Sequence, residues 1–304
     1  MSKHILGPFL SIAAIVVSVT MSINCTSDRA SFEDQAPNTG AAAEPSPFVA
    51  PDAAANDSGA VATDEECAGE IKLVYVFTRD AKIVRFDPAT LTFTELGRVI
   101  CPTSSDANSM AIDRHGEAWL AFTDTRVFNV PLRTLECTEV VLNWPEGNGR
   151  TGRFGMAFSK DDSETGESLF MGGNGLWKTD PRTLEVQHIG EAKPLSAVFE
   201  LSGTGDGKLF GWGAGNGILG RLDLVSGNVL EWEQTNVVGR DWAFAQWGGD
   251  FWLFVQLDRG EGFKSTSVVR YSPLTRTSAV VVEDAGMIVV GAGSSTCAPY
   301  APPK

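Results

Sequence analysis

The sequence predicts an all-β protein, a β-propeller of five four-stranded blades, on three observations. First, a unit of two strands joined by a short turn occurs five times between residues 82 and 282. Second, corresponding positions of the units lie 43 to 49 residues apart, a period typical of propeller blades. Third, a further apolar hairpin precedes four of the units and brings those blades to four strands each.

The five units share two aligned columns. One column is polar or basic and contains Arg85, Asn129, Lys178, Arg221 and Arg270. The other carries a hydroxyl in the turn and contains Thr90, Thr134, Thr183, Ser226 and Thr275. We expect these hydroxyls to bond to the backbone of their own turns.

The preceding hairpins supply the two inner strands of each blade. They lie at residues 108–122, 154–173, 199–213 and 241–255. The first unit has only one strand before it, at residues 70–78, and the strand at 286–296 has no unit after it. We therefore expect residues 286–296 to complete blade one and close the ring, because an open ring would leave unpaired sheet edges.

Side chains alternate between two faces of each inner strand. The column expected to line the narrow centre is small: Ala111, Ala157, Ser202 and Ala243. The column expected to pack between blades is large: Met110, Met156, Leu201 and Trp242. The second strands carry a packing column of aromatics: Tyr75, Trp119, Phe170, Phe210 and either Phe251 or Trp252. The Gly248-Gly249 pair leaves the register of the fifth blade open by one residue.

Residues 1–24 are expected to be an export signal. A basic start at Lys3 precedes 17 uncharged residues, 5–21, a stretch slightly short for a bilayer span. The following Ser-Ile-Asn-Cys at residues 22–25 resembles a bacterial lipobox, in which the cysteine is acylated, although Ser22 and Asn24 depart from that pattern. Two alternatives stay open: acylation of Cys25, which the segment behind it favours, and a plain secretory signal.

Residues 25–66 are predicted to be a disordered, acidic, Ala- and Pro-rich tether. From residue 26 to residue 66 the chain has nine acidic residues and one basic residue, and it has too few apolar side chains to offset the entropy of ordering. More than half of the net charge of −14 lies in this segment, so the propeller domain at 67–304 is only mildly acidic. We therefore expect no nucleic-acid partner, and contact with a membrane only through a lipid anchor.

Four cysteines remain beside Cys25, and an even number in an exported chain predicts two disulfides. Cys67 should pair with Cys297, because they flank the two halves of the hairpin that the ends of the domain divide in blade one. Cys101 and Cys137 then pair by elimination. The expected location is the bacterial cell envelope, as a lipoprotein, or the extracellular space.

The strand–glycine–strand units, above all SMAIDRHGEAWLAF from Ser109, resemble those of the propeller group containing NHL repeats, gluconolactonases and streptogramin lyases. The phrases VVGAGSSTCAP and WGGDFWLF also resemble exported bacterial propeller proteins of uncharacterised function. The gluconolactonase likeness implies a divalent metal held at the ring mouth by Glu, Asn and Asp side chains. The lyase likeness implies histidine chemistry in the channel, but His115 and His188 are expected on a blade-end turn and on an outermost strand.

Two carboxylates are predicted to enter the ring mouth. Two residues before the small column the inner strands carry Ser109, Gly155, Glu200 and Asp241. Adjacent carboxylates repel unless a proton or a cation intervenes, and oxygen ligands suit Ca²⁺ or Mg²⁺. The alternative is that Glu200 and Asp241 accept hydrogen bonds from backbone N–H groups at strand starts. Asn108 is the nearest asparagine, but it is one residue from Ser109 along the strand, so the alternation predicts that its side chain faces away from the ring mouth.

The function expected from these features is binding of a small molecule, glycan or protein at the ring mouth, with Asn108, Ser109, Arg153 and Trp242 as mouth residues. Long loops at 143–153 and 256–266 favour this interpretation. The alternative is a metal-dependent lactonase or hydrolase that uses Glu200 and Asp241. A purely structural envelope protein is a third possibility, so the partner is an unknown ligand or an envelope protein, and catalysis stays open.

Overall fold

The computed structural model describes residues 48, 67, 69–146, 152–260 and 262–302. The predicted signal at 1–24, the acylation site Cys25 and all of the predicted tether except Phe48 lie outside these residues. Within the described part of the chain, no helix has the length and apolar character needed to cross a membrane.

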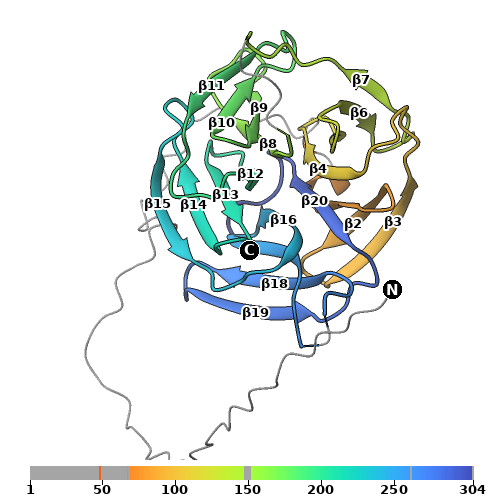
Figure 1. Ribbon diagram of the computed structural model, residues 1–304, viewed down its shortest axis with the longest axis vertical. Helices are drawn as coiled ribbons and strands as arrows, with labels where there is room; N and C mark the ends of the chain where they lie inside the picture. Colours follow the sequence, from red (N-terminus) through yellow and green to blue (C-terminus); the bar gives the residue numbers. More distant parts are fainter. Residues whose placement is uncertain (1–47, 49–66, 68, 147–151, 261, 303–304) are drawn as a thin grey trace, which may run out of the picture. The chain divides into compact units, whose positions relative to one another are not determined.

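The described residues form five antiparallel sheets of four strands each, preceded by a short 3₁₀ helix, η1 (Gly69–Lys72) (Figure 1). From the centre outward, blade one contains β20 (Val289–Ser294), β1 (Val74–Thr78), β2 (Lys82–Asp87) and β3 (Thr92–Arg98). Blade two contains β4 (Ala107–Ile112), β5 (Glu117–Phe122), β6 (Val127–Pro131) and β7 (Thr138–Val140).

The other three blades repeat this order. Blade three contains β8 (Gly155–Lys160), β9 (Glu167–Gly172), β10 (Leu176–Thr179) and β11 (Val186–Gly190). Blade four contains β12 (Glu200–Gly203), β13 (Leu209–Gly213), β14 (Ile218–Leu222) and β15 (Val229–Gln234). Blade five contains β16 (Arg240–Trp247), β17 (Asp250–Gln256), β18 (Ser267–Ser272) and β19 (Thr277–Val282). The predicted five-bladed propeller is confirmed.

The ring closes in blade one as the sequence predicts. The C-terminal strand β20 pairs antiparallel with β1, so the two ends of the domain share one sheet. The Ser295 hydroxyl donates to the Ile71 carbonyl at 2.7 Å, and a disulfide joins Cys67 to Cys297. The second predicted disulfide, Cys101–Cys137, links the segment after β3 to the start of β7.

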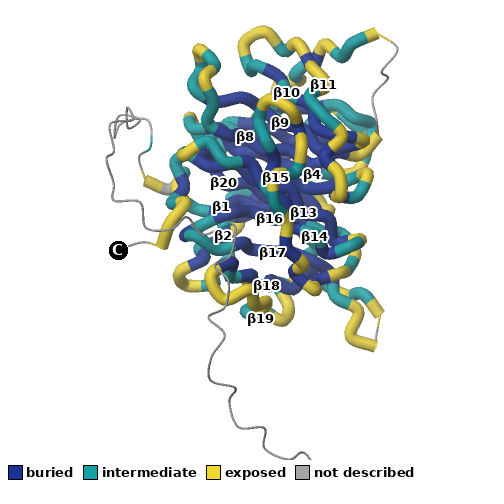
Figure 2. Tube along the Cα trace, turned by 90° about the vertical axis from the view of Figure 1, so that its left-hand side faces the viewer, coloured by how far each residue is buried: buried dark blue, intermediate teal, exposed yellow. Residues whose placement is uncertain are grey.

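The core of the described residues is divided into five apolar clusters, one at each seam between adjacent blades. Three large inner-strand residues, Met110, Met156 and Leu201, are fully buried in three of these seams. In Figure 2 the inner strands are mostly buried, whereas exposed residues concentrate on the outer strands and turns. Each blade is therefore held mainly by packing on its two neighbours.

The predicted columns of the outer units also appear in the strand register. The polar column lies opposite the aromatic column of the second strands, in the pairs Tyr75–Arg85, Trp119–Asn129, Phe170–Lys178, Phe210–Arg221 and Trp252–Arg270. The fifth aromatic is thus Trp252 rather than Phe251. Two of the cations lie over their aromatic partners, Lys178 over Phe170 and Arg270 over Trp252.

Each hydroxyl turn has a residue with positive φ directly after the hydroxyl. These residues are Leu91, Leu135, Leu184, Gly227 and Arg276, with φ between 54° and 66°. The left-handed conformation is costly for a residue with a side chain. The predicted bonds between turn hydroxyl and turn backbone occur in three turns, where the hydroxyl oxygens of Thr134, Thr183 and Ser226 accept from the N–H two residues on, at 3.4 to 3.5 Å. In the other two turns the Thr90 and Thr275 hydroxyls bond instead to the hydroxyls of Thr92 and Thr277.

Phe48, inside the predicted tether, packs on the seam between blades four and five. Its ring lies edge-on to Phe210 at 5.7 Å and to Phe251 at 6.0 Å between centroids. Edge-to-face aromatic pairs of this kind are stabilising beyond the area that they bury. One residue of the segment before Cys67 therefore contacts the propeller core.

Candidate functional site

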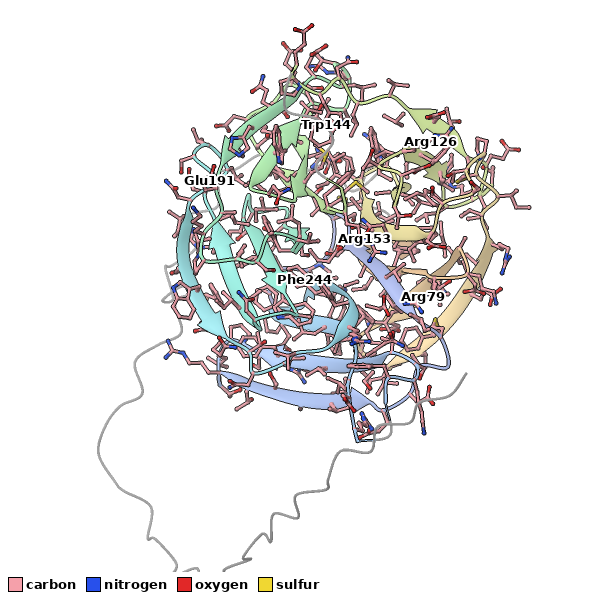
Figure 3. All side chains as sticks on the ribbon, in the orientation of Figure 1. Arg79, Arg126, Trp144, Arg153, Glu191 and Phe244 are labelled. Atoms are coloured by element: carbon pink, nitrogen blue, oxygen red, sulfur yellow. A yellow bond between two sulfur atoms is a disulfide. The ribbon has the colours of Figure 1, made fainter. Side chains whose placement is uncertain are left out.

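A cavity of about 310 Å³ lies at the end of the ring where the innermost strands begin. All five blades contribute to this mouth cavity, which is lined by Arg79, Asp106, Ala107, Asn108, Arg153, Val198, Glu200, Asp241, Trp242 and Val290. In Figure 3 the labelled Arg153 lies near the middle of the ring, and Arg79 lies toward blade one. Residues distant in sequence thus meet at one polar site.

Three β-bulges shape the rim of the mouth cavity. At the start of three innermost strands, one residue has no partner in the regular register: Asn108 in β4, Asp241 in β16 and Val290 in β20. A bulge inserts one extra residue and re-aims the side chains near it. The bulge explains how Asn108 reaches the cavity despite its place in the alternation.

The predicted register of blade five is wrong by two residues. Ala245 lies opposite Trp252, as Ala111 lies opposite Trp119, so Ala245 and not Ala243 belongs to the innermost small column. The hairpin turn here is only Gly248-Gly249, both with positive φ, and pairing continues to Trp247–Asp250. A two-residue turn of this type needs φ above zero at both positions, which glycine permits.

This shift changes which residues stand level with Glu200. The column now contains Gly291, Ser109, Gly155, Glu200 and Ala243, and Asp241 lies in the bulge two residues nearer the rim. The large column correspondingly contains Phe244 in place of Trp242. Glu200 and Asp241 therefore share the cavity, as predicted, but at different levels.

Below the mouth cavity the innermost strands pack directly on one another. A Cβ on Gly155 would lie 2.4 Å from the Glu200 backbone, and a Cβ on Gly291 would lie 2.6 Å from the Met110 nitrogen. The residues next along this face, Ala111 and Ala245, are fully buried. The expected small column thus seals the centre of the ring instead of lining an open channel.

Glu200 forms the buried floor of the mouth cavity and is only 4% exposed. Its Oε2 accepts a hydrogen bond from the Ser109 hydroxyl at 2.8 Å, and the Ser109 Oγ accepts from the Met156 N–H at 3.1 Å. Among the described residues, Ser109 is the partner that this carboxyl has. Burial raises the pKa of Glu200 well above its ordinary value, despite the opposing effect of the Ser109 bond, and so favours the neutral acid.

Asp241 is held differently, because its carboxylate forms an ion pair with the Arg79 guanidinium. Both side chains are partly exposed, at 24% for Asp241 and 49% for Arg79. The mouth cavity therefore holds one buried carboxyl, Glu200, with a single described partner, and one partly exposed carboxylate, Asp241, paired with an arginine.

The other predicted mouth residues divide into lining and supporting positions. Asn108, Arg153 and Trp242 line the mouth cavity, and the Asn108 amide donates to the Phe154 carbonyl at 2.9 Å. Ser109 lies beneath the cavity and is fully buried, so it supports Glu200 instead of facing a ligand. Arg153 is exposed, and its guanidinium makes no hydrogen bond or ion pair with the residues that the structure describes.

The partners seen for the two carboxylates are side chains rather than backbone amides. Within the described ranges, no group of three or more His, Cys, Asp or Glu side chains could hold a metal ion. His188 lies on the outermost strand β11, where its ring packs at a tilt against Trp177, and His115 lies in the turn between β4 and β5. The Ca²⁺ or Mg²⁺ site at Glu200 and Asp241 stays a prediction.

Sequence reasoning missed five residues of the mouth cavity, namely Arg79, Asp106, Ala107, Val198 and Val290. Arg79 directly follows β1, in the turn at the mouth end of blade one, and its charge in that turn was the available signal. Val290 comes from the closing strand β20, whose bulge faces the cavity. Blade one was the hardest to interpret because its inner strand comes from the far end of the chain.

Comparison with known proteins shows no family for this chain. No protein-family model matches the chain, and no curated protein matches it. Among solved structures, a protein of unknown function from Bacteroides caccae is 13% identical, with 72% of this chain and 97% of that chain covered, at a TM-score of 0.47. A chain of the nidogen/laminin complex is 9% identical, with 73% and 99% covered, at a TM-score of 0.48. Likenesses this distant carry no argument, and it is the strand topology of the chain itself that identifies a five-bladed β-propeller.

Proposed function

We propose that this protein is a ligand-binding β-propeller that holds a small organic molecule in the mouth cavity. The observation that carries the proposal is the buried Glu200 carboxyl on the floor of a cavity to which all five blades contribute. A buried polar group with incomplete hydrogen bonding costs stability, so its retention at a concave site suggests a binding role. Trp242 and Asn108 add one aromatic and one amide surface, which suit a small polar ligand.

A divalent-metal-dependent lactonase or hydrolase is the second candidate. It is favoured by the presence of Glu200, Asp241 and Asn108 around one cavity, since these are oxygen donors. Two observations weigh against it: burial favours the neutral form of Glu200, and Arg79 already neutralises Asp241. Binding therefore ranks above metal-assisted hydrolysis.

Native mass spectrometry of the exported protein, with elemental analysis, tests the two candidates together. We expect a co-purifying small molecule that is lost in the variant Trp242→Ala. The matched control is Trp232→Ala, because Trp232 is 52% exposed on the outer strand β15, away from the mouth cavity. Stoichiometric Ca²⁺ or Mg²⁺ would favour the hydrolase, and a bound protein without a small molecule would contradict the proposal.

We also propose that the chain is exported and anchored to a bacterial membrane through Cys25. Two disulfides in the described domain agree with an oxidising compartment, and the lipobox-like residues 22–25 supply the acylation site. Replacing Cys25 by Ser should move the protein from the membrane fraction to the soluble fraction. A wild-type protein that is already soluble, with an unmodified N-terminus, would refute the anchor.

A further inference from the structure

Two polar groups of the mouth cavity have hydrogen-bonding capacity that the described residues leave unused. The Oε2 atom of Glu200 accepts from Ser109, which leaves the other carboxyl oxygen available to the cavity that Glu200 lines. The Arg153 guanidinium also lines the cavity and is unbonded to any described residue. One group is buried on the floor and the other is exposed at the rim, so a ligand could contact both.

The protonation of Glu200 decides what these two groups can bind. Burial raises its pKa and so favours the neutral acid, and the Ser109 bond to Oε2 leaves the other oxygen as the place for a proton that faces the cavity. A neutral carboxyl is a hydrogen-bond donor, and a guanidinium has donors only. Two converging donors, one of them charged, match an acceptor group with negative charge.

We infer that the ligand of the mouth cavity is a small organic carboxylate, with one carboxylate oxygen accepting from the Glu200 carboxyl and the group as a whole paired with Arg153. The inference rests on the proposed binding function and narrows it to one chemical class. Guanidinium–carboxylate pairs are planar and frequently bidentate, which favours a carboxylate over a spherical anion. Asn108 and Trp242 contact the remainder of the molecule.

The other charges around the cavity are compatible with an anion. Asp241, at the start of β16, is paired with Arg79, which follows β1, so together they add no net charge. Asp106, before β4, is exposed at the rim. Apart from Glu200, the lining thus has two arginines and two aspartates, so their formal charges cancel, and Arg153 is the arginine that forms no ion pair with a described residue.

The replacement Glu200→Gln separates this inference from a cation site. Glutamine keeps a neutral donor on the cavity floor, so a carboxylate ligand should still bind, within a few-fold of the wild-type affinity. A cation needs the ionised carboxylate and should be lost in the same variant. Replacing Arg153 by Gln should weaken carboxylate binding about tenfold or more, whereas Arg133→Gln, on an exposed turn of blade two, serves as the matched control.

The experiment measures the thermal shift of the full-length protein with succinate, D-gluconate, D-glucose, CaCl₂ and MgCl₂ as probes, at pH 5 and pH 8. We expect the carboxylates to raise the melting temperature, more at pH 5 than at pH 8, because the bound state needs the Glu200 proton. Glu200→Gln should keep the shift and lose its pH dependence, and Arg153→Gln should lose the shift.

Three results would overturn the inference. One is a shift with Ca²⁺ or Mg²⁺ that Glu200→Gln abolishes. Another is a shift with D-glucose that the carboxylates do not give, and a third is no response to either carboxylate. The proposed binding function fails separately, if native mass spectrometry finds no small molecule in the wild-type protein.

Discussion

Two buried glutamates lie at opposite ends of the ring and differ in their hydrogen-bond partners. Glu200, 4% exposed, is at the start of β12 and therefore at the mouth. Glu167, 3% exposed, is at the start of β9, which runs antiparallel to the innermost strand and so begins at the other end. Burial raises the pKa of both carboxyls.

The difference lies in their partners. Glu167 accepts from the Arg114 N–H at 2.9 Å and from the Thr296 hydroxyl at 2.6 Å, and the Arg114 side chain lies 3.9 Å away. Glu167, in blade three, thus links blade two, through Arg114, to Thr296, the residue that precedes Cys297 of the disulfide. The Glu200 carboxyl accepts one hydrogen bond, from Ser109, and otherwise faces the mouth cavity. A buried carboxyl that the fold satisfies completely is structural, whereas one that faces an open cavity is a candidate for ligand binding.

The largest loss of stability should come from removing the Cys67–Cys297 disulfide, which lies at the end of the ring opposite the mouth cavity, near Glu167. Its cysteines are 230 residues apart, and replacing both by Ser should cost about 5 kcal/mol of unfolding free energy, because the long loop is no longer restricted in the unfolded chain. Denaturant unfolding measures this loss. Replacing both Cys101 and Cys137, 36 residues apart, should cost about 1.6 kcal/mol less. Equal losses would show that loop length is not what decides the contribution.

If truncation of Glu167 and of Glu200 to Ala lowers the unfolding free energy equally, the distinction between a structural and a ligand-binding glutamate is wrong. Glu167→Ala leaves the Arg114 N–H and the Thr296 hydroxyl without their acceptor in a buried site, so we expect a loss of about 3 kcal/mol. Glu200→Ala removes one hydrogen bond beside a cavity that water can enter, so the loss should be about 1 kcal/mol. Urea unfolding at constant pH measures both variants.

The pH dependence of stability sharpens the comparison further. A carboxyl whose folded-state pKa is raised stabilises the fold fully below its unfolded value, near 4.5, and this contribution is lost as pH rises through the folded-state pKa. Glu200→Gln removes that dependence, so the variant should be more stable than the wild type at neutral pH. The difference should vanish below pH 4.5. An advantage that is constant with pH would exclude a displaced pKa.

The smallest effect on stability is expected at the rim of the mouth cavity. Arg79→Gln breaks a partly exposed ion pair with Asp241, and such pairs contribute about 0 to 1 kcal/mol. Ligand binding should nevertheless weaken, because the free Asp241 carboxylate adds a negative charge to the cavity. The control is Arg182→Gln, which breaks exposed ion pairs with Glu164 and Asp180 on blade three. A stability loss above 2 kcal/mol at Arg79 would mean that the rim is structural.

Most of the fold could be predicted from the sequence, and less of the site. The period, the hydroxyl turns and the aromatic column located every blade, and the position of Cys67 and Cys297 beside the divided hairpin paired them correctly. The register of blade five was wrong because the Gly248-Gly249 turn is shorter than the turn in blade two, so pairing extends to Trp247. Asn108 and Asp241 reach the cavity through bulges, and a bulge breaks the two-residue alternation from which facing is predicted.

The sequence by itself determined the five-bladed ring, its closure by the last strand and both disulfides, because repeats and apolar alternation are properties of local order along the chain. Only the tertiary structure decided that packed small residues seal the centre of the ring and that Arg79 forms an ion pair with Asp241. It also decided that the Glu200 carboxyl is buried and accepts a hydrogen bond from Ser109. These features depend on how closely five separate strands approach at one axis. That distance is set by packing between blades, which no single segment of the sequence encodes.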